Sequence, residues 1–93
     1  MRGYPGKVMD KKKNILITED HGIVCRGLYY LIMLNFPGCI IHEVASIKEM
    51  KLRLPAGNFT HLILDLTLPD GNSIDVLPGL IEQYPQLKIL ILS

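Results

Sequence analysis

The sequence predicts an α/β fold in which helices cover both faces of a parallel sheet. Short runs rich in Ile, Leu and Val alternate along the chain with segments whose apolar residues recur at helical spacing. This alternation is typical of βαβ units, whose crossovers are right-handed. The chain has 93 residues, enough for one domain, and a formal net charge of +1. Such a charge gives no general electrostatic argument for binding to nucleic acid or membrane.

The first half of the domain is expected to contain two strands and two helices. Residues 14–18 form an apolar run that predicts a strand buried on both faces, and residues 24–35 show helical spacing. Residues 39–45 predict a second, more polar strand, which suits the edge of the sheet. Ser46 and Glu49 then form a capping box that opens a short second helix.

The second half is expected to repeat this pattern. Residues 61–64 predict a third buried strand that leads directly into Asp65. After a turn that contains Pro, Asp, Gly and Asn, residues 74–84 show a third helical stripe. Pro78 interrupts that stripe, because a proline inside a helix costs about 3 kcal/mol or more unless the helix bends or starts late. Residues 87–92 predict a fourth strand.

The predicted domain spans residues 14–93, and residues 1–13 are expected to be a disordered leader or tag remnant. No apolar run is long enough to span a bilayer, and the leader lacks the apolar segment of a signal peptide. Cys25 and Cys39 are not spaced as a metal or redox motif. We therefore expect a cytoplasmic chain with reduced thiols.

Polar side chains follow three of the four predicted strands at their carboxyl ends, where functional groups gather in such sheets. They are Glu19, Asp20, Asp65 and Ser93. Converging carboxylates repel one another, so they favour a hard divalent cation such as Mg²⁺, with Ca²⁺ or Mn²⁺ as other candidates. With that ion in place, Asp65 could accept a phosphoryl group as a nucleophile. The hydroxyl of Ser93 could then hydrogen-bond the phosphoryl oxygen.

A simpler explanation of the same residues stays open. Acidic pairs at strand ends are often solvated, and Asp20 could cap the helix that follows. A serine at the last position often has no role. The three histidines, His21, His42 and His61, share no metal-ligand spacing, and His21 is expected only to line a loop.

Taken in order, three segments resemble the receiver domain of two-component response regulators, particularly the subgroup usually joined to a LuxR-type helix-turn-helix output domain. They are residues 15–21 with 26–28, residues 42–46 and residues 64–71. The resemblance implies a flavodoxin-like, doubly wound sheet with strand order 2-1-3-4. It also implies that a histidine kinase or a small phosphodonor supplies the phosphoryl group.

The resemblance assigns a role to each candidate residue. Asp65 would be the phosphoacceptor, and Asp20 would ligate Mg²⁺ directly. Glu19, in place of the commoner Asp, would act mainly through water. The backbone carbonyl of Thr67 would complete the protein ligands, and Ser93 would be the switch hydroxyl.

The family has a fifth strand, an essential lysine after it, and further helices, none of which follows Ser93. We therefore expect a truncated receiver of about four strands and three helices. Its fourth strand would expose an apolar edge and pair with a second copy, giving a homodimer or higher oligomer. No contact with nucleic acid is expected from this fragment, because any DNA-binding role would belong to an output domain.

Three functions follow from these observations. The leading one is a phosphoacceptor signalling module, which is at most capable of self-phosphorylation and autodephosphorylation at Asp65 and is not a free-standing enzyme. A second is a truncated receiver that acts only by binding. A haloacid-dehalogenase-like phosphatase is disfavoured, because that family has a second Asp where this chain has Thr67.

Overall fold

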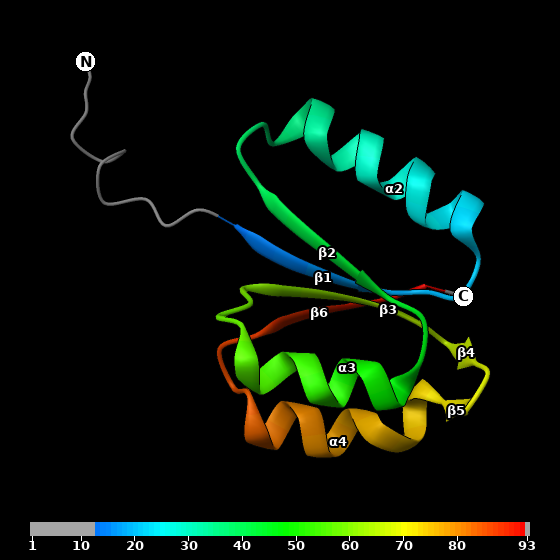
Figure 1. Cartoon of the computed structure of the whole chain (residues 1–93). Coiled ribbons are helices and arrows are strands. Elements are labelled where there is room, and N and C mark those ends of the chain that lie inside the picture. The colour runs from blue at the N-terminus through cyan, green and yellow to red at the C-terminus, as the bar shows by residue number, and fades with distance from the viewer. Residues whose placement is uncertain (1–12, 93) are drawn as a thin grey trace.

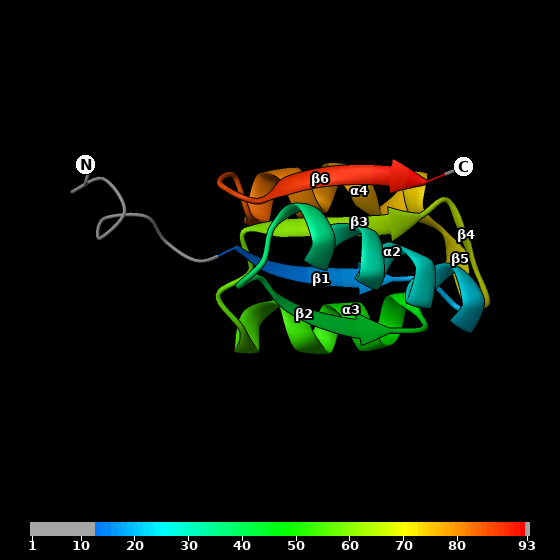
Figure 2. The same cartoon turned by 90° about the horizontal axis from the view of Figure 1, so that it is seen from above.

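The computed structural model describes residues 13–92, which form three layers (Figure 1). α2 covers one face of a central parallel sheet, and α3 and α4 cover the other (Figures 1 and 2). The strand order β2-β1-β3-β6 confirms the predicted doubly wound sheet with its main strands in the order 2-1-3-4. The strands are β1 (Asn14–Thr18), β2 (Ile40–Val44), β3 (His61–Asp65) and β6 (Lys88–Leu92), and the α-helices are α2 (Gly22–Asn35), α3 (Ile47–Arg53) and α4 (Ser73–Gln83).

β1 lies in the interior of the sheet, paired with β2 on one side and β3 on the other, and β2 is an edge strand as expected. Because successive strand residues point to opposite faces, Leu16 and Ile17 enter different cores. The core on the α3 and α4 side contains Leu16, Val44, Ile47, Met50, Leu54, Leu62, Leu64, Leu68 and Leu80. The core on the α2 side contains Ile15, Ile17, Cys25 and Ile63.

α2 has weak end signals. Its N-cap residue is His21, and no side chain forms a capping hydrogen bond there. The alternative that Asp20 caps this helix is therefore wrong, because the helix starts at Gly22, one residue too late for that role. Cys25 is the only residue of α2 that is fully buried.

α3 is capped twice. The hydroxyl of Ser46 accepts a hydrogen bond from the backbone N–H of Glu49 at 3.1 Å, which confirms the capping box. The carboxylate of Glu49 reaches back to the N–H of Ala45. Asp70, from a distant turn, accepts hydrogen bonds from the N–H groups of Ile47 and Lys48, each at 2.9 Å. A short 3₁₀ turn, η1 (Leu54–Ala56), follows α3.

α4 runs through Pro78 without interruption, so the third helix expected at residues 74–84 is confirmed. The proline lies in the second turn and removes one backbone hydrogen bond, to the carbonyl of Ile74. Asn72 offsets part of that loss, because its side chain caps the helix by accepting from the N–H of Ile74 at 2.8 Å. The cap and the buried side chain of Leu80 together support the helix against one unfavourable residue.

Between β3 and α4 the chain forms a small antiparallel ribbon of β4 (Thr67–Leu68) and β5 (Gly71–Asn72). The tight turn was expected, but the ribbon was not. Gly71 has a φ of 153°, a backbone conformation that glycine adopts without strain. The expected leader, except for Lys13, and the expected switch residue Ser93 lie outside the described residues. Within residues 13–92, no helix has both the length and the apolar character needed to cross a membrane.

Candidate functional site

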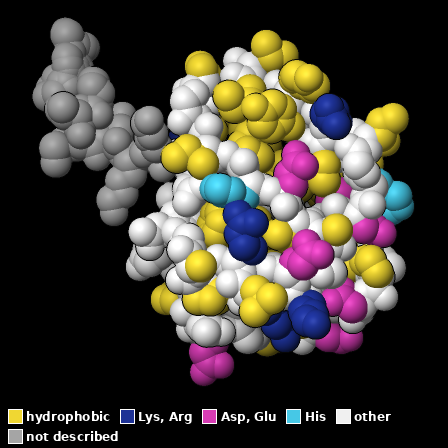
Figure 3. All heavy atoms as spheres, viewed as in Figure 1, with side chains coloured by type: hydrophobic (Ala, Val, Ile, Leu, Met, Phe, Trp, Pro, Cys, Tyr) yellow, Lys and Arg dark blue, Asp and Glu magenta, His cyan; other side chains and the backbone are white. Residues whose placement is uncertain are grey.

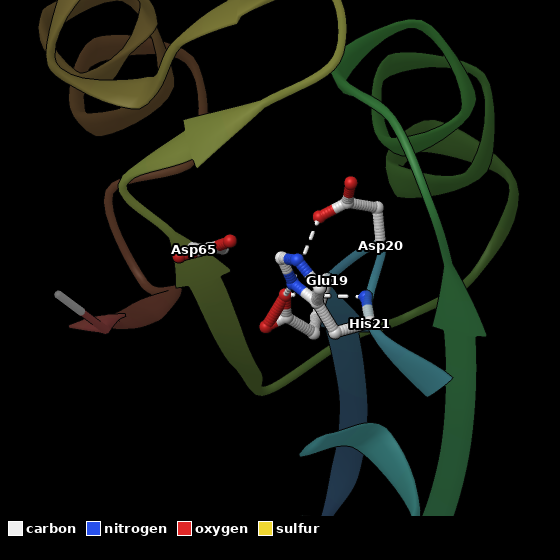
Figure 4. Close-up of side chains that lie close together, drawn as sticks. All are labelled: Glu19, Asp20, His21 and Asp65. Carbon is white, nitrogen blue, oxygen red and sulfur yellow. Dashed lines mark hydrogen bonds and ion pairs between the residues drawn. The ribbon is translucent and has the colours of Figure 1, made fainter. Parts of the chain in front are cut away.

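Acidic side chains from two neighbouring strands meet at one end of the sheet (Figure 4). Glu19 and Asp20 follow β1, and Asp65 is the last residue of β3. Because β1 and β3 are parallel and adjacent, their carboxyl ends lie together. One ligand atom from each of Glu19, Asp20, His21 and Asp65 lies within 4.8 Å of the others. The structure thus brings together the three carboxylates that the sequence singled out.

His21 is also part of this cluster. Sequence reasoning expected it only to line a loop and missed this position. Its Nδ1 lies 2.7 Å from Oε2 of Glu19 and 3.2 Å from Oδ1 of Asp20 (Figure 4). Its backbone N–H also donates to Oε2 of Glu19. The hydrogen bond to Glu19 and the charge of Asp20 raise the pKa of His21. The signal available in the sequence was its position directly after the acidic pair.

The two strand-end carboxylates carry charge unequally. Glu19 is buried and Asp65 is half-buried. Burial raises the pKa of Asp65, and the adjacent Glu19 raises it further. Burial also opposes charge on Glu19, but hydrogen bonds from the side chains of His21 and Asp65 outweigh it and lower the pKa of Glu19. Crowded carboxylates of this kind are stabilised in their charged form by a cation.

The backbone around Asp65 is held from two sides. The buried hydroxyl of Ser73, at the start of α4, donates to the carbonyl of Asp65. The N–H of Ser73 donates to the carbonyl of Leu66, and the N–H of Leu66 donates to the carbonyl of Leu92 in β6, both at 2.8 Å. Sequence reasoning did not identify Ser73. These bonds fix where the Asp65 side chain leaves the strand.

Thr67 and Asp70, which both follow Asp65 in the chain, occupy different positions relative to the acidic cluster. Thr67 lies in β4, paired with Asn72, and its expected role as a carbonyl ligand stays a prediction. The carboxylate of Asp70 accepts hydrogen bonds from the first turn of α3. Asp70 is therefore not part of the acidic cluster. The acidic site therefore consists of the three predicted carboxylates and His21.

The donor set suits a hard divalent cation. Carboxylate oxygens are the ligands that Mg²⁺, Ca²⁺ and Mn²⁺ prefer. An imidazole is a poorer ligand for Mg²⁺, and in this structure Nδ1 of His21 hydrogen-bonds to Glu19 and lies within ion-pair distance of Asp20. Cation binding and the His21 contacts would therefore compete for the same oxygens.

No protein-family model matches the chain. Curated proteins, by contrast, do match it in sequence. The DNA-binding transcriptional activator DevR/DosR of Mycobacterium tuberculosis is 34% identical over 79 residues, which cover 85% of this chain and 36% of the relative. The transcriptional regulatory protein BasR of Escherichia coli is 29% identical over 79 residues, which cover 85% and 35%. The chain thus spans about a third of the length of these relatives.

Solved structures of response regulators share the fold. The response regulator MaeR bound to beryllium trifluoride superposes with a TM-score of 0.80 at 26% identity, covering 86% of this chain and 66% of that one. The non-phosphorylated receiver domain of the stress response regulator RcsB from Escherichia coli gives 0.78 at 25% identity, covering 89% and 66%. The chain is a response-regulator homologue with the receiver fold.

This receiver agrees with the predicted family in its strand order. Its relatives are named as regulators of transcription in two bacteria. The roles of the individual site residues stay predictions.

Proposed function

We propose that this receiver is the phosphoacceptor module of a two-component phosphorelay, in which a histidine kinase transfers a phosphoryl group to Asp65 and thereby switches an output. The observation that carries the proposal is the convergence of Glu19, Asp20 and Asp65 at the carboxyl ends of adjacent parallel strands. A receiver that acts only by binding is the alternative, and the relatives do not favour it. The proposal also places the chain in the cytoplasm, which agrees with its two free cysteines.

The chemistry is a simple displacement at phosphorus. A carboxylate oxygen of Asp65 forms the new P–O bond while the bond from phosphorus to the donor nitrogen, or to the carboxyl oxygen of a small acyl phosphate, breaks. The leaving group takes the electron pair, and the product is an aspartyl phosphate. Bound Mg²⁺ would offset charge on the phosphoryl oxygens.

The chain's own residues would position the reactants. Glu19 and Asp20 would hold the cation beside Asp65, with the carbonyl of Thr67 as a further ligand. The hydrogen bond from Ser73 keeps the Asp65 backbone in place while its side chain reacts. The hydroxyl of Ser93 would contact the phosphoryl group and report its arrival.

The deciding experiment is intact mass after incubation of the 93-residue chain with Mg²⁺ and acetyl phosphate. We expect a gain of one phosphoryl group, lost in Asp65→Asn and retained in Asp75→Asn, which alters an exposed acid on α4. Circular dichroism of each variant checks that it is folded. A folded wild-type chain that gains no mass in this assay supports the binding-only alternative instead.

The cation site has a test of its own. Asp20→Asn removes one charged ligand without changing the size of the side chain, so we expect about ten-fold weaker Mg²⁺ binding. Amide chemical shifts at Glu19, His21 and Leu66 during a Mg²⁺ titration report this directly. Equal affinity in the variant would exclude Asp20 as a ligand.

We also propose that the chain self-associates along β6. This strand pairs only with β3 among the described residues, and its residue Leu90 is 58% exposed. An apolar edge strand with free backbone groups is a template for a further strand. Leu90→Lys should shift the chain toward monomer in sedimentation velocity; an unchanged distribution would argue against this edge.

A further inference from the structure

The backbone of His21 directs its side chain toward the acidic cluster. This residue is the N-cap of α2 and is extended, with a φ of −102° and a ψ of 108°. Its carbonyl accepts hydrogen bonds from the N–H groups of Val24 and Cys25 at 3.0 and 3.1 Å, which fix it to the first turn of the helix. In extended backbone, residues two apart point to the same side. The imidazole of His21 and the carboxylate of Glu19 therefore share one space.

The imidazole lies among the oxygens that would hold a cation. Its Nδ1 lies 2.7 Å from Glu19 and 3.2 Å from Asp20, and Figure 4 shows the ring between these two carboxylates. The ligand atoms of these residues and of Asp65 lie within 4.8 Å of one another. Two ligand atoms about 2.1 Å from one ion lie at most about 4.2 Å apart. A small movement of the side chains therefore brings all four atoms around one ion.

Glu19 and His21 differ in how firmly their side chains are held. The side chain of Glu19 is 4% exposed and that of His21 is 65% exposed. Figure 3 shows acidic side chains at the right-hand edge of the molecule, with a histidine exposed among them. Packing keeps the Glu19 carboxylate in place, whereas the ring of His21 is able to turn without losing buried contacts. A buried carboxylate needs a partner, and an ion that replaces His21 in that role releases the ring beside it.

We propose that His21 is a nitrogen ligand that makes this site prefer Mn²⁺ to Mg²⁺. The proposal rests on the cation site proposed above. Either ion must displace the ring from Glu19 and so costs one hydrogen bond. Mg²⁺ takes oxygen ligands and returns nothing to the ring, whereas imidazole is a good ligand for first-row transition-metal ions. With Mn²⁺, the nitrogen exchanges its hydrogen bond for coordination.

The other ligands indicate which transition-metal ion fits. Three carboxylates and one imidazole form a mostly oxygen set, which suits Mn²⁺ better than ions that select thiolates. The thiol of Cys25 lies outside the cluster and donates to the carbonyl of Glu19 at 3.5 Å. Ca²⁺ is disfavoured, because it takes about six to eight oxygen ligands and gains nothing from a nitrogen.

The first test compares the affinities of the 93-residue chain for Mn²⁺ and Mg²⁺ by isothermal titration calorimetry at one fixed pH. His21→Phe keeps a ring and removes both nitrogens. We expect the ratio of Mn²⁺ to Mg²⁺ affinity to fall about ten-fold in this variant, because only Mn²⁺ loses a ligand. His61→Phe, which changes a histidine at the opposite end of β3, is the matched control and should leave the ratio unchanged. Circular dichroism checks that each variant is folded.

The second test detects the nitrogen itself. Pulsed electron paramagnetic resonance of the Mn²⁺-loaded chain should show the ¹⁴N coupling of a directly bound imidazole. This coupling should be lost in His21→Phe and retained in His61→Phe. A histidine that only hydrogen-bonds to the carboxylates would not produce it.

A lower affinity ratio together with loss of the nitrogen coupling in His21→Phe supports the proposal. An unchanged ratio in that variant, or a Mn²⁺-loaded wild type without imidazole coupling, overturns it while leaving the cation site in place. If neither ion binds the folded wild-type chain, the cation site fails and the role of His21 fails with it. Phosphorylation at Asp65 is measured separately by intact mass with Mg²⁺, so the failures are distinguishable.

Discussion

The two faces of the sheet are stabilised to different extents. Nine buried residues form the core under α3 and α4, but four form the core under α2. α3 has capping hydrogen bonds from Ser46 and Asp70, whereas α2 has no side-chain cap at its N-terminus. The acidic residues Glu19 and Asp20 lie in the connection that leads into α2. The comparison indicates that the functional loop belongs to the less stable layer, as is common for binding loops.

The largest effect is expected from Met50→Ala on the well-packed side. Met50 is fully buried in the core under α3 and α4. Loss of its side chain and the cavity left behind should lower the free energy of unfolding by about 3 kcal/mol. Urea denaturation measures this change. A loss below about 1 kcal/mol would mean that this layer is less tightly packed than the structure indicates.

Ser73→Ala probes the link between this layer and the site. The variant removes the buried Ser73 hydroxyl, so the carbonyl of Asp65 loses the hydrogen bond that it accepts from it. We expect a loss of about 1–2 kcal/mol in unfolding free energy. Asn72→Ala, which removes only the exposed cap of α4, should cost about 1 kcal/mol and serves as the comparison. Equal losses of unfolding free energy in the two variants would show that burial of the Ser73 hydrogen bond adds nothing to its stabilising effect.

Leu28→Ala makes the corresponding change under α2. Leu28 is only half-buried against its core, so we expect a loss of about 1 kcal/mol. Native-state hydrogen exchange sharpens the comparison, because amides of α2 should exchange before those of α3 and α4. Slower exchange in α2 than in α3 would reverse the proposed order of stability.

The smallest effect concerns Asp70 and appears only in acid. Hydrogen bonds from the backbone N–H groups of Ile47 and Lys48 lower the pKa of Asp70 below its ordinary value of 3.8. Its stabilising contribution is therefore present above pH 3.8 and is lost as the pH falls through the lower pKa of the folded state. Asp70→Asn should reduce the loss of stability in this range, measured by urea denaturation at a series of pH values. If the wild type and Asp70→Asn lose stability identically as the pH falls, the charge of Asp70 does not cause that loss.

Much of the fold could be predicted because its signals are local. Buried parallel strands are continuous apolar runs, and the carboxyl ends of adjacent strands must meet, so Glu19, Asp20 and Asp65 could be grouped without a structure. The capping box at Ser46 is likewise a short-range pattern. These features depend on a few neighbouring residues.

The missed features depend on contacts between distant segments. Asp70 caps a helix that begins 23 residues earlier in the chain, and no local pattern encodes that bond. Ser73 acts on a backbone carbonyl eight residues away. The helix expected at residues 74–84 forms despite Pro78, and its support comes from the cap at Asn72 and the packing of Leu80. Tertiary contacts overrode the local preference.

The position of β1 also constrains how the chain folds as it is synthesised. β1 is the first described strand to leave the ribosome, yet one of its neighbours, β3, lies 46 residues further along, as the bonds between Asn14 and Thr60 show. Until that segment emerges, β1 can pair only with β2, and one edge of the most buried strand stays open. Non-local pairing of this kind slows folding and exposes apolar edges meanwhile. The nascent chain is therefore expected to need protection by a chaperone for longer than an all-helical domain of this size.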